Sequence, residues 1–493
     1  MLTRTALAIL MGATVLGAQA IPARPEQLVY KPMSFTAPKA KDHFVKLQNG
    51  ISAYLVADPG GQPLVTIRVL IKGGSFLDAP GKEGTARLMG DLLDTGGTQD
   101  LSAGQLAEKL ETLAARVSST MDATMGFLQM NLMEKDAKEG LELFRDMLTR
   151  PAFQQDRLDL AKRQMRQGLE RRNDDTPSIE QYQLGYLLRG ENHYTNHATT
   201  AASLDSITQA DLKALQARLL HPKNLIVAVS GRFDPKVMTR LLNETLGALK
   251  PSAQARVSPP VPAPEHVMKP GIYVCEKDVN QSRVSIALPG LRRSDADWLP
   301  VQVMNFILGG DFTARLVMKI RTEEGLAYSV GSFFTPGPFY RGDFRAAFQT
   351  KIRTVPYGIR LALAEFERIR STPVSDEELA MAKGAMVDRF PGMFSNKAAV
   401  AALFAQEDYT AGDPAYYETF RDKVQAVTKA DLQRVAQKYL TVGQAVILVT
   451  GGKAADLEEG DTKDHPGKLS EVAKLPVVRL PLRDPLTMKV LAQ

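Results

Sequence analysis

The chain has 493 residues, of which 44% are hydrophobic and 24% are charged, and its formal net charge is +6. This composition is typical of a globular protein that is long enough to form two or more hydrophobic cores. The basic residues are scattered among acidic ones, and the glycine pairs lack the Lys-Ser/Thr of a phosphate loop, so neither nucleic-acid binding nor nucleotide binding is expected.

Residues 1–20 have the layout of a cleavable secretory signal. An Arg precedes an apolar stretch at 6–18, which ends in Ala-Gln-Ala before a segment that contains proline. The apolar stretch is too short to span a bilayer comfortably; a retained anchor and a mitochondrial presequence are the alternatives. Cys275 is the only cysteine, so an exported chain would carry no internal disulfide. We therefore expect a periplasmic protein with an N-terminal extension at 21–37 and no membrane insertion after signal cleavage.

Several segments of the first half have a simple interpretation. Apolar residues alternate at 65–71, which predicts a strand before a helix. The stretch 121–133, which contains several Met residues, also alternates like a strand and is expected to pack in the interior. His193 and His197 are four residues apart, a spacing that could bind a metal on one helix. Their neighbours are rich in loop formers, however, so a loop without a ligand role is favoured.

The chain contains an internal duplication. At an offset of 220 residues, Thr208-Gln-Ala-Asp-Leu matches Thr428-Lys-Ala-Asp-Leu, and the apolar residues that follow match in order and spacing. In both copies Thr stands three residues before Asp, which is the arrangement of a capping box. Each copy is therefore predicted to be a capped helix followed by a strand. The proline-rich stretch 250–267 between the copies resists helix and central strand, and is expected to be an extended linker.

The second half carries two further segments of interest. A strand at 284–288 and a helix from about Trp298 precede Ile-Leu-Gly-Gly-Asp-Phe-Thr-Ala-Arg-Leu at 307–316. Arg-Thr-Glu-Glu-Gly-Leu-Ala-Tyr-Ser-Val follows at 321–330. From the residue pattern alone, the Arg that opens this segment would form a surface ion pair with Glu323 or Glu324, and its Tyr would be a half-buried strand residue.

These segments, together with the run GKEGTARLMGDLLDTGGT at 81–98, resemble the insulinase and pitrilysin-type metallopeptidases, an inverzincin family. The family's helix reads H-x-x-E-H, in which two His bind zinc and the Glu acts on the bound water. In this chain the two His positions are Arg87 and Asp91, and the Glu position is Gly90. The resemblance therefore implies that the zinc motif is degenerate.

The position of the family's third zinc ligand gives the same answer. That ligand, a Glu, falls near residues 166–168, where the neighbouring carboxylate is Glu170. One carboxylate cannot hold a zinc ion, and an Arg at a ligand position adds a fixed positive charge. We therefore expect this chain to bind no catalytic zinc and no other cofactor.

The resemblance also implies the fold. We expect an α+β protein of two homologous half-domains, each an antiparallel-rich mixed sheet with helices packed on one face. The half-domains would span residues 38–249 and 268–455, joined by the Pro-rich linker at 250–267. Residues 456–493 are expected to be a tail that lies on its own domain or is partly disordered; an arm that packs on a partner is the alternative.

In the family, an Arg and a Tyr seven residues apart serve a zinc site that lies in another half. Here they would be Arg321 and Tyr328, acting in trans. Tyr328 would donate its hydroxyl to the carbonyl oxygen under attack, and Arg321 would hold a substrate carbonyl or orient the Tyr. Gly309 and Gly310 would let the backbone approach an extended substrate, which could add as a strand to a sheet edge.

Some members of the family work as pairs in which one subunit carries the metal and the other carries the Arg and Tyr. We therefore expect a non-catalytic substrate-binding subunit of a heteromeric zinc endopeptidase, inactive alone. Its partners would be a homologous zinc-bearing peptidase subunit, in a heterodimer or larger assembly, and peptide substrates. The alternatives are an inactive scaffold or peptide-binding protein of the same fold, and an active enzyme with an unforeseen metal set.

Overall fold

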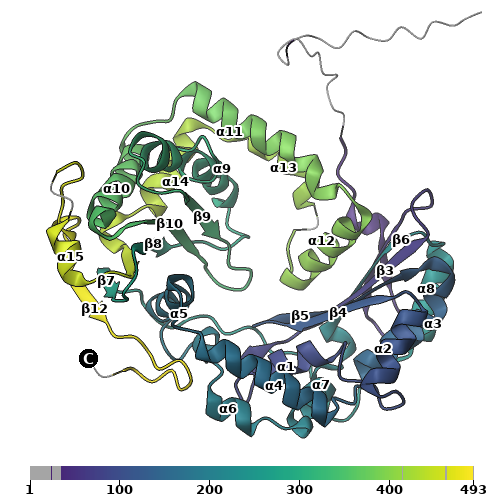
Figure 1. Cartoon of the computed structure of the whole chain (residues 1–493). Coiled ribbons are helices and arrows are strands. Elements are labelled where there is room, and N and C mark those ends of the chain that lie inside the picture. The colour runs from purple at the N-terminus through teal and green to yellow at the C-terminus, as the bar shows by residue number, and fades with distance from the viewer. Residues whose placement is uncertain (1–23, 25–34, 414, 461–462, 492–493) are drawn as a thin grey trace, which may run out of the picture. The chain divides into compact units, whose positions relative to one another are not determined.

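The structure is a computed structural model, and it describes residues 24, 35–413, 415–460 and 463–491. The expected signal at 1–20 lies outside the described residues. From Ala37 onward the chain forms one unit that contains two six-stranded mixed sheets with helices around them (Figure 1). The expected α+β fold of two similar halves is confirmed.

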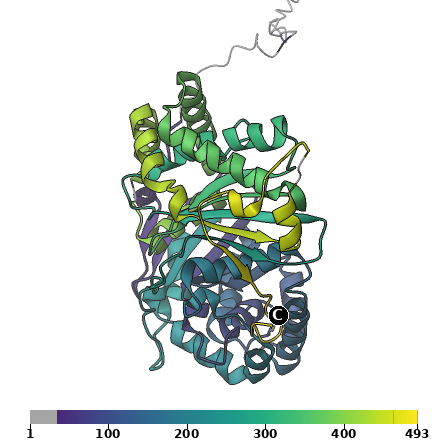
Figure 2. The ribbon, with the colours of Figure 1, turned by 90° about the vertical axis from the view of Figure 1, so that its left-hand side faces the viewer.

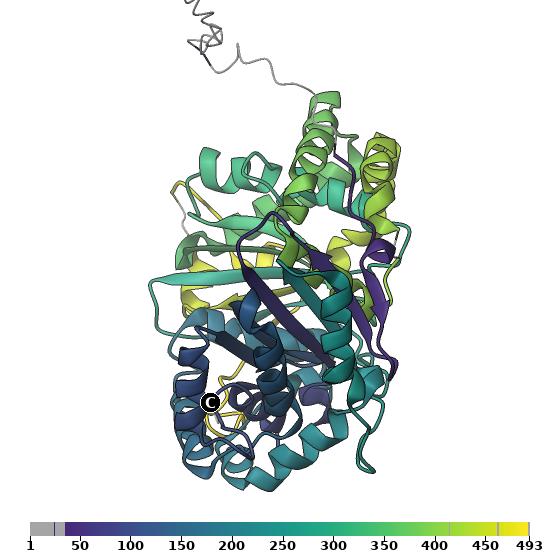
Figure 3. The same ribbon diagram turned by 90° about the vertical axis from the view of Figure 1, so that its right-hand side faces the viewer.

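The first sheet has the strand order β1-β2-β6-β3-β5-β4. Strands β2 and β6 are parallel, and the other neighbouring pairs are antiparallel. The expected strand at 65–71 is β3. Most of the stretch 121–133 is strand β5, whose alternate residues are buried as expected, and its first residue, Met121, ends β4. The strands are β1 (Phe44–Lys46), β2 (Ser52–Ala57), β3 (Leu64–Lys72), β4 (Arg116–Met121), β5 (Met125–Met133) and β6 (Leu225–Gly231). Figure 3 shows the purple N-terminal strands of this sheet from the side.

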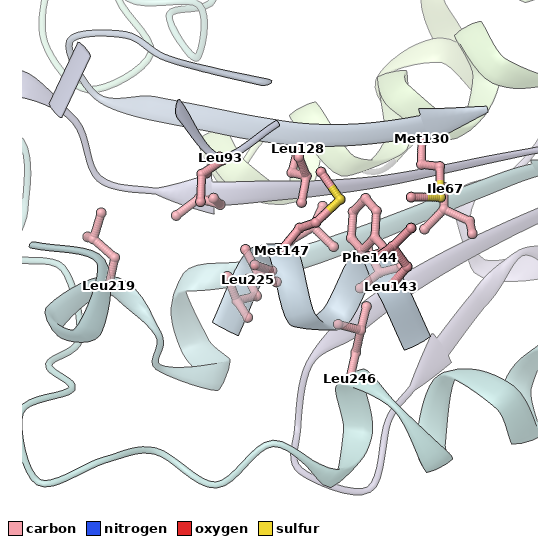
Figure 4. Close-up of a cluster of buried hydrophobic side chains, with 14 of the residues drawn as sticks. Ile67, Leu93, Leu128, Met130, Leu143, Phe144, Met147, Leu219, Leu225 and Leu246 are labelled. Atoms are coloured by element: carbon pink, nitrogen blue, oxygen red, sulfur yellow. The ribbon is translucent and has the colours of Figure 1, made fainter. Parts of the chain in front are cut away.

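One face of the first sheet packs on helices of its own half (Figure 1). Alternate residues of β3 and β5 point into this core, where they meet Phe144 and Met147 of α3 (Figure 4). Burial of these large apolar side chains is the main force that joins the helices to the sheet. The helices are α1 (Thr85–Leu92), α2 (Ala103–Thr112), α3 (Ala137–Thr149), α4 (Gln155–Glu170), α6 (Ala201–Ser206), α7 (Gln209–Leu219) and α8 (Pro235–Glu244).

The second sheet repeats this plan with the order β12-β7-β11-β8-β10-β9. Strands β7 and β11 are parallel, as β2 and β6 are in the first sheet, but the sixth strand β12 is parallel to its neighbour whereas β1 is antiparallel. The strands are β7 (Gly271–Cys275), β8 (Gln281–Pro289), β9 (Val330–Thr335), β10 (Asp343–Lys351), β11 (Val446–Thr450) and β12 (Val477–Leu480). The helices are α9 (Trp298–Leu308), α10 (Val355–Ser371), α11 (Asp376–Arg389), α12 (Lys397–Thr410), α13 (Tyr416–Ala426), α14 (Lys429–Tyr439) and α15 (Ala454–Glu459).

The duplicated unit is present in both halves. Thr208 accepts a hydrogen bond from the backbone of Asp211 at the start of α7, and the Asp carboxylate accepts one from the backbone of Thr208. Thr428 and Asp431 form the same capping box at the start of α14. Strands β6 and β11 follow these helices, so the predicted pattern of capped helix and strand is confirmed.

Each half lends one helix to the sheet of the other half. Helix α12 packs on the first sheet, where Phe404 and its neighbours contact Tyr54 and Ile226. Helix α5 (Thr176–Arg189) belongs to the first half but packs on the second sheet through Leu184 and Leu188. The two exchanged helices cover part of the sheet faces that the halves' own helices leave open (Figure 1).

Both exchanged helices also carry a buried glutamate that is paired with an arginine. Glu180 of α5 accepts from the Nε of Arg283 at 2.7 Å and from Ser285. Glu407 of α12 lies 2.6 Å from the guanidinium of Arg293. Because a buried charge is costly unless it is paired, these contacts fix where the exchanged helices sit.

The C-terminal segment contacts both halves. Strand β12 extends the second sheet, and the chain then continues to the first half, as the yellow segment in Figure 2 shows. There the guanidinium of Arg172 donates to the carbonyl of Pro485 at 3.0 Å, and the backbone of Ala201 donates to Leu486 at 2.7 Å. Residues 250–267 form no helix or strand and contact the first half, for example through Ser258 and the carbonyl of Lys72.

Candidate functional site

Helix α1 carries the three degenerate zinc positions. It begins after Gly84, whose φ of +110° is in the left-handed region that favours glycine. The carboxylate of Asp78 accepts hydrogen bonds from the backbone of Gly84 and Ala86 and so satisfies free amides of the first turn. Burial outweighs these bonds and raises the pKa of Asp78 to about 6. The start of α1 is therefore held by Asp78, a residue that precedes the run at 81–98.

The two His positions are occupied by an ion pair. The Nε of Arg87 lies 2.9 Å from a carboxylate oxygen of Asp91 one helical turn later, and the two side chains are 59% and 33% exposed. Such pairs stabilise a helix only slightly because water and salt screen them. The side chains at the two positions that bind zinc in the family thus form an ion pair with each other in this chain.

The Glu position is closed by the neighbouring strand. A β-carbon at Gly90 would lie 2.3 Å from the backbone nitrogen of Met121 and 2.7 Å from the carbonyl carbon of Thr120. The hydroxyl of Ser119 also donates to the carbonyl of Gly90 at 2.6 Å. Helix α1 and strand β4 therefore approach more closely than any side chain at position 90 permits.

The third ligand position offers no carboxylate either. On α4, Arg166 pairs with Asp205, and Gly168 lines a cavity of about 730 Å³ together with Arg87 and Asp91. Two further arginines line this cavity, so its charge is unsuited to a cation. In the ranges that the structure describes, no group of three or more His, Cys, Asp or Glu side chains could hold a metal. Zinc does not fit the residues present.

Arg321 lies in a π-helical turn, η8 (Val317–Glu323), between α9 and β9. The surface ion pair that the residue pattern suggests for Arg321 is not formed. Lys319 instead pairs with Glu323 at 2.9 Å and with Glu324 at 3.1 Å. Short π-helical segments are rare and are often found at functional sites.

The guanidinium of Arg321 lies between two exposed aromatic rings. Its central carbon is 5.3 Å from the ring centre of Phe312 and 5.3 Å from that of Tyr328. Tyr328 is 89% exposed, so the suggestion that it is half-buried is wrong, and Phe312 is 75% exposed. Among the described residues neither the guanidinium nor the Tyr hydroxyl has a hydrogen-bond partner. Their donors are therefore available to another molecule.

The segment that presents Tyr328 is held firmly. The backbone of Leu326 donates to Ile320 at 2.9 Å, and the hydroxyl of Thr350 on β10 donates to the carbonyl of Leu326 at 2.8 Å. Ala327, directly before the Tyr, is buried. Both the backbone N–H and the carbonyl of Leu326 are thus bonded, so the backbone two residues before the exposed phenol is anchored to the fold. Sequence reasoning missed Phe312, although an aromatic residue within a polar, glycine-rich segment is a usable signal.

Gly309 and Gly310 follow α9 and face their own chain. A β-carbon at Gly309 would lie 2.4 Å from the hydroxyl oxygen of Ser332 on β9, and the carbonyl of Gly309 accepts from the backbone of Ser332 at 2.9 Å. Gly310 is exposed, and its missing side chain faces Asn305. The close approach at Gly309 therefore serves contact between α9 and β9, and substrate contact by these glycines stays a prediction.

His193 and Cys275 have structural surroundings. The ring nitrogens of His193 lie 2.8 Å from the hydroxyl of Thr195 and 3.4 Å from the carbonyl of Pro262, at a short turn that follows α5. Cys275 ends β7 with no exposed surface. Both side chains are engaged within the protein.

We predict that Cys275 does not react in the folded protein. Burial raises the pKa of its thiol to about 11, so the nucleophilic thiolate is scarce at neutral pH as well as inaccessible. Iodoacetamide at pH 7.5, followed by mass spectrometry of the intact chain, should leave the native protein unmodified and add one group in urea. Rapid labelling of the native protein would contradict the buried position.

The fold and the degenerate motif define an inactive member of a metallopeptidase class. Residues 55–196 match the family described as "Insulinase (Peptidase family M16)", and residues 206–386 match "Peptidase M16 inactive domain". The chain belongs to the M16 family.

Some similar proteins are named as peptidases and others as non-peptidase homologues. A protein of Helicobacter pylori named non-peptidase homolog YmxG is 25% identical over 403 residues, which are 80% of this chain and 90% of that protein. An uncharacterized zinc protease of Streptomyces coelicolor is 21% identical over 78% of this chain and 86% of its own length. The crystal structure of an M16 inactive domain from Pseudomonas fluorescens superposes with a TM-score of 0.74 at 24% identity, covering 83% of this chain and 97% of that one.

A further solved structure is larger. The periplasmic protease PqqL of Escherichia coli gives a TM-score of 0.70 at 16% identity, covering 87% of this chain and 50% of that chain. This likeness concerns the fold. No helix in the described part of our chain is long and apolar enough to cross a membrane.

Proposed function

We propose that this protein is the non-catalytic, substrate-binding subunit of a heteromeric zinc endopeptidase in the periplasm. It supplies Arg321 and Tyr328 to the zinc site of a homologous partner subunit. The observation that best supports the proposal is that the guanidinium of Arg321 and the hydroxyl of Tyr328 have no hydrogen-bond partner among the described residues of this chain. The closed zinc positions Arg87, Gly90 and Asp91 support it, because such donors are useful to hydrolysis only where another chain holds the metal.

The chemistry of the two side chains matches this role. The partner's metal supplies an activated water molecule. When water attacks a peptide carbonyl, negative charge develops on the oxygen, and a hydroxyl fixed at that position stabilises the transition state more than the ground state. Tyr328 offers that hydroxyl from a rigid segment, and the cation–π contact with Arg321 holds its ring in place.

Reconstitution tests the proposal. The purified chain should not cleave an internally quenched peptide, whereas its mixture with an exported M16 subunit that carries an intact H-x-x-E-H should do so. Arg321→Ala should depress the activity of the mixture, and Arg240→Ala on α8, a 67% exposed side chain in the first half, should not. Normal peptide hydrolysis by a mixture that contains a double variant lacking both Arg321 and the Tyr328 hydroxyl would contradict the proposal. That result would favour a peptide-binding scaffold.

Chelation provides an independent check on where the metal resides. Stoichiometric zinc in the purified single chain, or hydrolysis by it that a chelator abolishes, would contradict the account of α1. Metal analysis of the two subunits before mixing should instead find zinc in the partner.

A further inference from the structure

The first sheet has a polar area on the face opposite its core. On this face the cluster around α12 covers β2, β6 and the end of β3 near Leu70, and it reaches β5 only at its first residue, Met125. Strand register places Arg68 of β3 beside Gln129 of β5, and Gln129 beside Ser118 of β4. Because neighbouring strands are about 4.8 Å apart, these three side chains form one row across the sheet. We call this row and the rows on either side of it the polar face.

Arg68 is the unusual member of the polar face. It is partly buried, and burial lowers the pKa of its guanidinium. Its central carbon lies 4.0 Å from the ring centre of Phe127, which stands in the next row. Within the described residues it has neither a hydrogen-bond partner nor a carboxylate within ion-pair distance. The ring holds the guanidinium in position without neutralising its charge.

Four other partly buried arginines of this protein have carboxylate partners, whereas Arg172 donates to the backbone carbonyls of Pro485 and Thr199. The pairs, with their nitrogen–oxygen distances, are Arg283 with Glu180 at 2.7 Å, Arg293 with Glu407 at 2.6 Å, Arg315 with Glu378 at 2.7 Å and Arg345 with Asp343 at 2.9 Å. A cation that is removed from water is costly unless it is paired. Within the described residues Arg68 has neither a carboxylate nor a carbonyl partner, and an external anion would supply one.

The neighbours of Arg68 add uncharged donors. The amide of Gln129 and the hydroxyl of Ser118 make no side-chain hydrogen bond to the described residues, and Ser118 is exposed. In the adjacent row, the hydroxyl of Thr66 donates to Asn131 at 2.7 Å, which closes that side. Arg116, opposite Asn131 on edge strand β4, is exposed and adds a second positive charge. The polar face therefore presents donors and positive charge to one carboxylate group.

We propose that the polar face binds a carboxylate side chain of an extended, acidic peptide, with Arg68 as the main contact and Gln129 and Ser118 as supporting donors. The inference deepens the proposed function, on which it rests for the identity of the peptide as a substrate, because it names the substrate class. A planar guanidinium can accept a carboxylate through two parallel hydrogen bonds, and its partial desolvation strengthens them. Substrates of the assembled enzyme would thus be selected for Asp or Glu away from the cleaved bond.

Direct binding to the intact single chain tests this inference without needing hydrolysis. Fluorescence anisotropy would measure the affinity of a labelled peptide of about twelve residues that contains two Glu residues. The same peptide with Gln at both positions is the comparison. The acidic peptide should bind about tenfold more tightly at low salt, and the advantage should shrink as salt is raised. Equal affinity of the two peptides would overturn the inference whatever the mixed enzyme does.

Two substitutions locate the contact. Arg68→Gln should remove most of the roughly tenfold preference, whereas Arg68→Lys should keep part of it because the charge remains. Arg240→Gln on α8 is the matched control and should retain the full preference. If Arg68→Gln folds, as judged by circular dichroism, and still prefers the acidic peptide tenfold, the assignment to the polar face is wrong. If Arg68→Gln does not fold, the preference of the Arg68→Lys variant for the acidic peptide is measured instead. An unchanged preference would then contradict the assignment. Failure of reconstituted hydrolysis with intact peptide preference would count against the proposed function alone.

Discussion

Tyr328→Phe is expected to lower kcat of the reconstituted enzyme by about 100- to 1000-fold, the loss that follows removal of one oxyanion donor. The substitution removes only the hydroxyl. The ring and its contact with Arg321, 5.3 Å away, remain, so neither the support nor the exposed surface should change. The lost hydrogen bond forms as charge develops on the substrate oxygen, so KM should change little. Steady-state kinetics of the mixed subunits, with saturating mutant chain, would measure both constants.

The partner residue provides the comparison. Arg321→Ala should also lower kcat, because the Tyr ring then loses the cation beside it, and Arg321→Lys should restore part of the activity through the same cation–π contact. If Tyr328→Phe instead raises KM and leaves kcat unchanged, the hydroxyl binds the ground state and has no role as an oxyanion donor. Unchanged kinetics would remove Tyr328 from the site altogether.

Gly90→Ala is expected to destabilise the chain by about 3 kcal/mol, at the upper end of the cost of overpacking a close contact. The new β-carbon would lie 2.3 Å from the backbone nitrogen of Met121, and the obstacle is a strand, which cannot move aside as a flexible side chain could. Urea unfolding would measure the effect as a fall in the midpoint. Gly384→Ala in α11 is the matched control, because no atom lies within 4 Å of its β-carbon, and it should be neutral or stabilise by about 0.5–1 kcal/mol.

The same contact bears on restoring the zinc motif. A variant that carries Arg87→His, Gly90→Glu and Asp91→His would have two His ligands in sequence but would force α1 away from β4. It also lacks a carboxylate at the third position on α4. We therefore expect it to be destabilised and to bind zinc no better than the unmodified chain does. A stable revertant with one tightly bound zinc would contradict the description of Gly90.

Local elements and the duplication could be predicted from the sequence because their signals are local. The alternation at β3, the helix from Trp298 and the capping boxes at Thr208 and Thr428 each depend on residues within a few positions of one another. The degenerate motif can also be read from the sequence, because Arg87 and Asp91 stand at the two His positions and Gly90 stands at the Glu position.

The surroundings of the candidate site could not be predicted in the same way. Residue pattern paired Arg321 with Glu323 or Glu324, but the π-helical turn points these carboxylates at Lys319 instead. The residue pattern predicts that Tyr328 is a half-buried strand residue, yet β9 begins only at Val330 and Tyr328 lies exposed outside the core. Phe312 belongs to the site because the guanidinium of Arg321, nine residues later, lies 5.3 Å from its ring centre, and this contact exists only in the folded chain.

The sequence by itself determined that this chain is a duplicated α+β protein with a disabled zinc motif and an intact Arg/Tyr segment. Only the tertiary structure decided that α5 and α12 are exchanged between the halves, that a strand lies against Gly90, and that the guanidinium of Arg68 has no carboxylate partner among the described residues. The physical reason is that patterning and capping act over one or two turns of chain. Burial and charge pairing, in contrast, depend on residues such as Glu180 and Arg283, which lie far apart in sequence and meet only in the folded molecule.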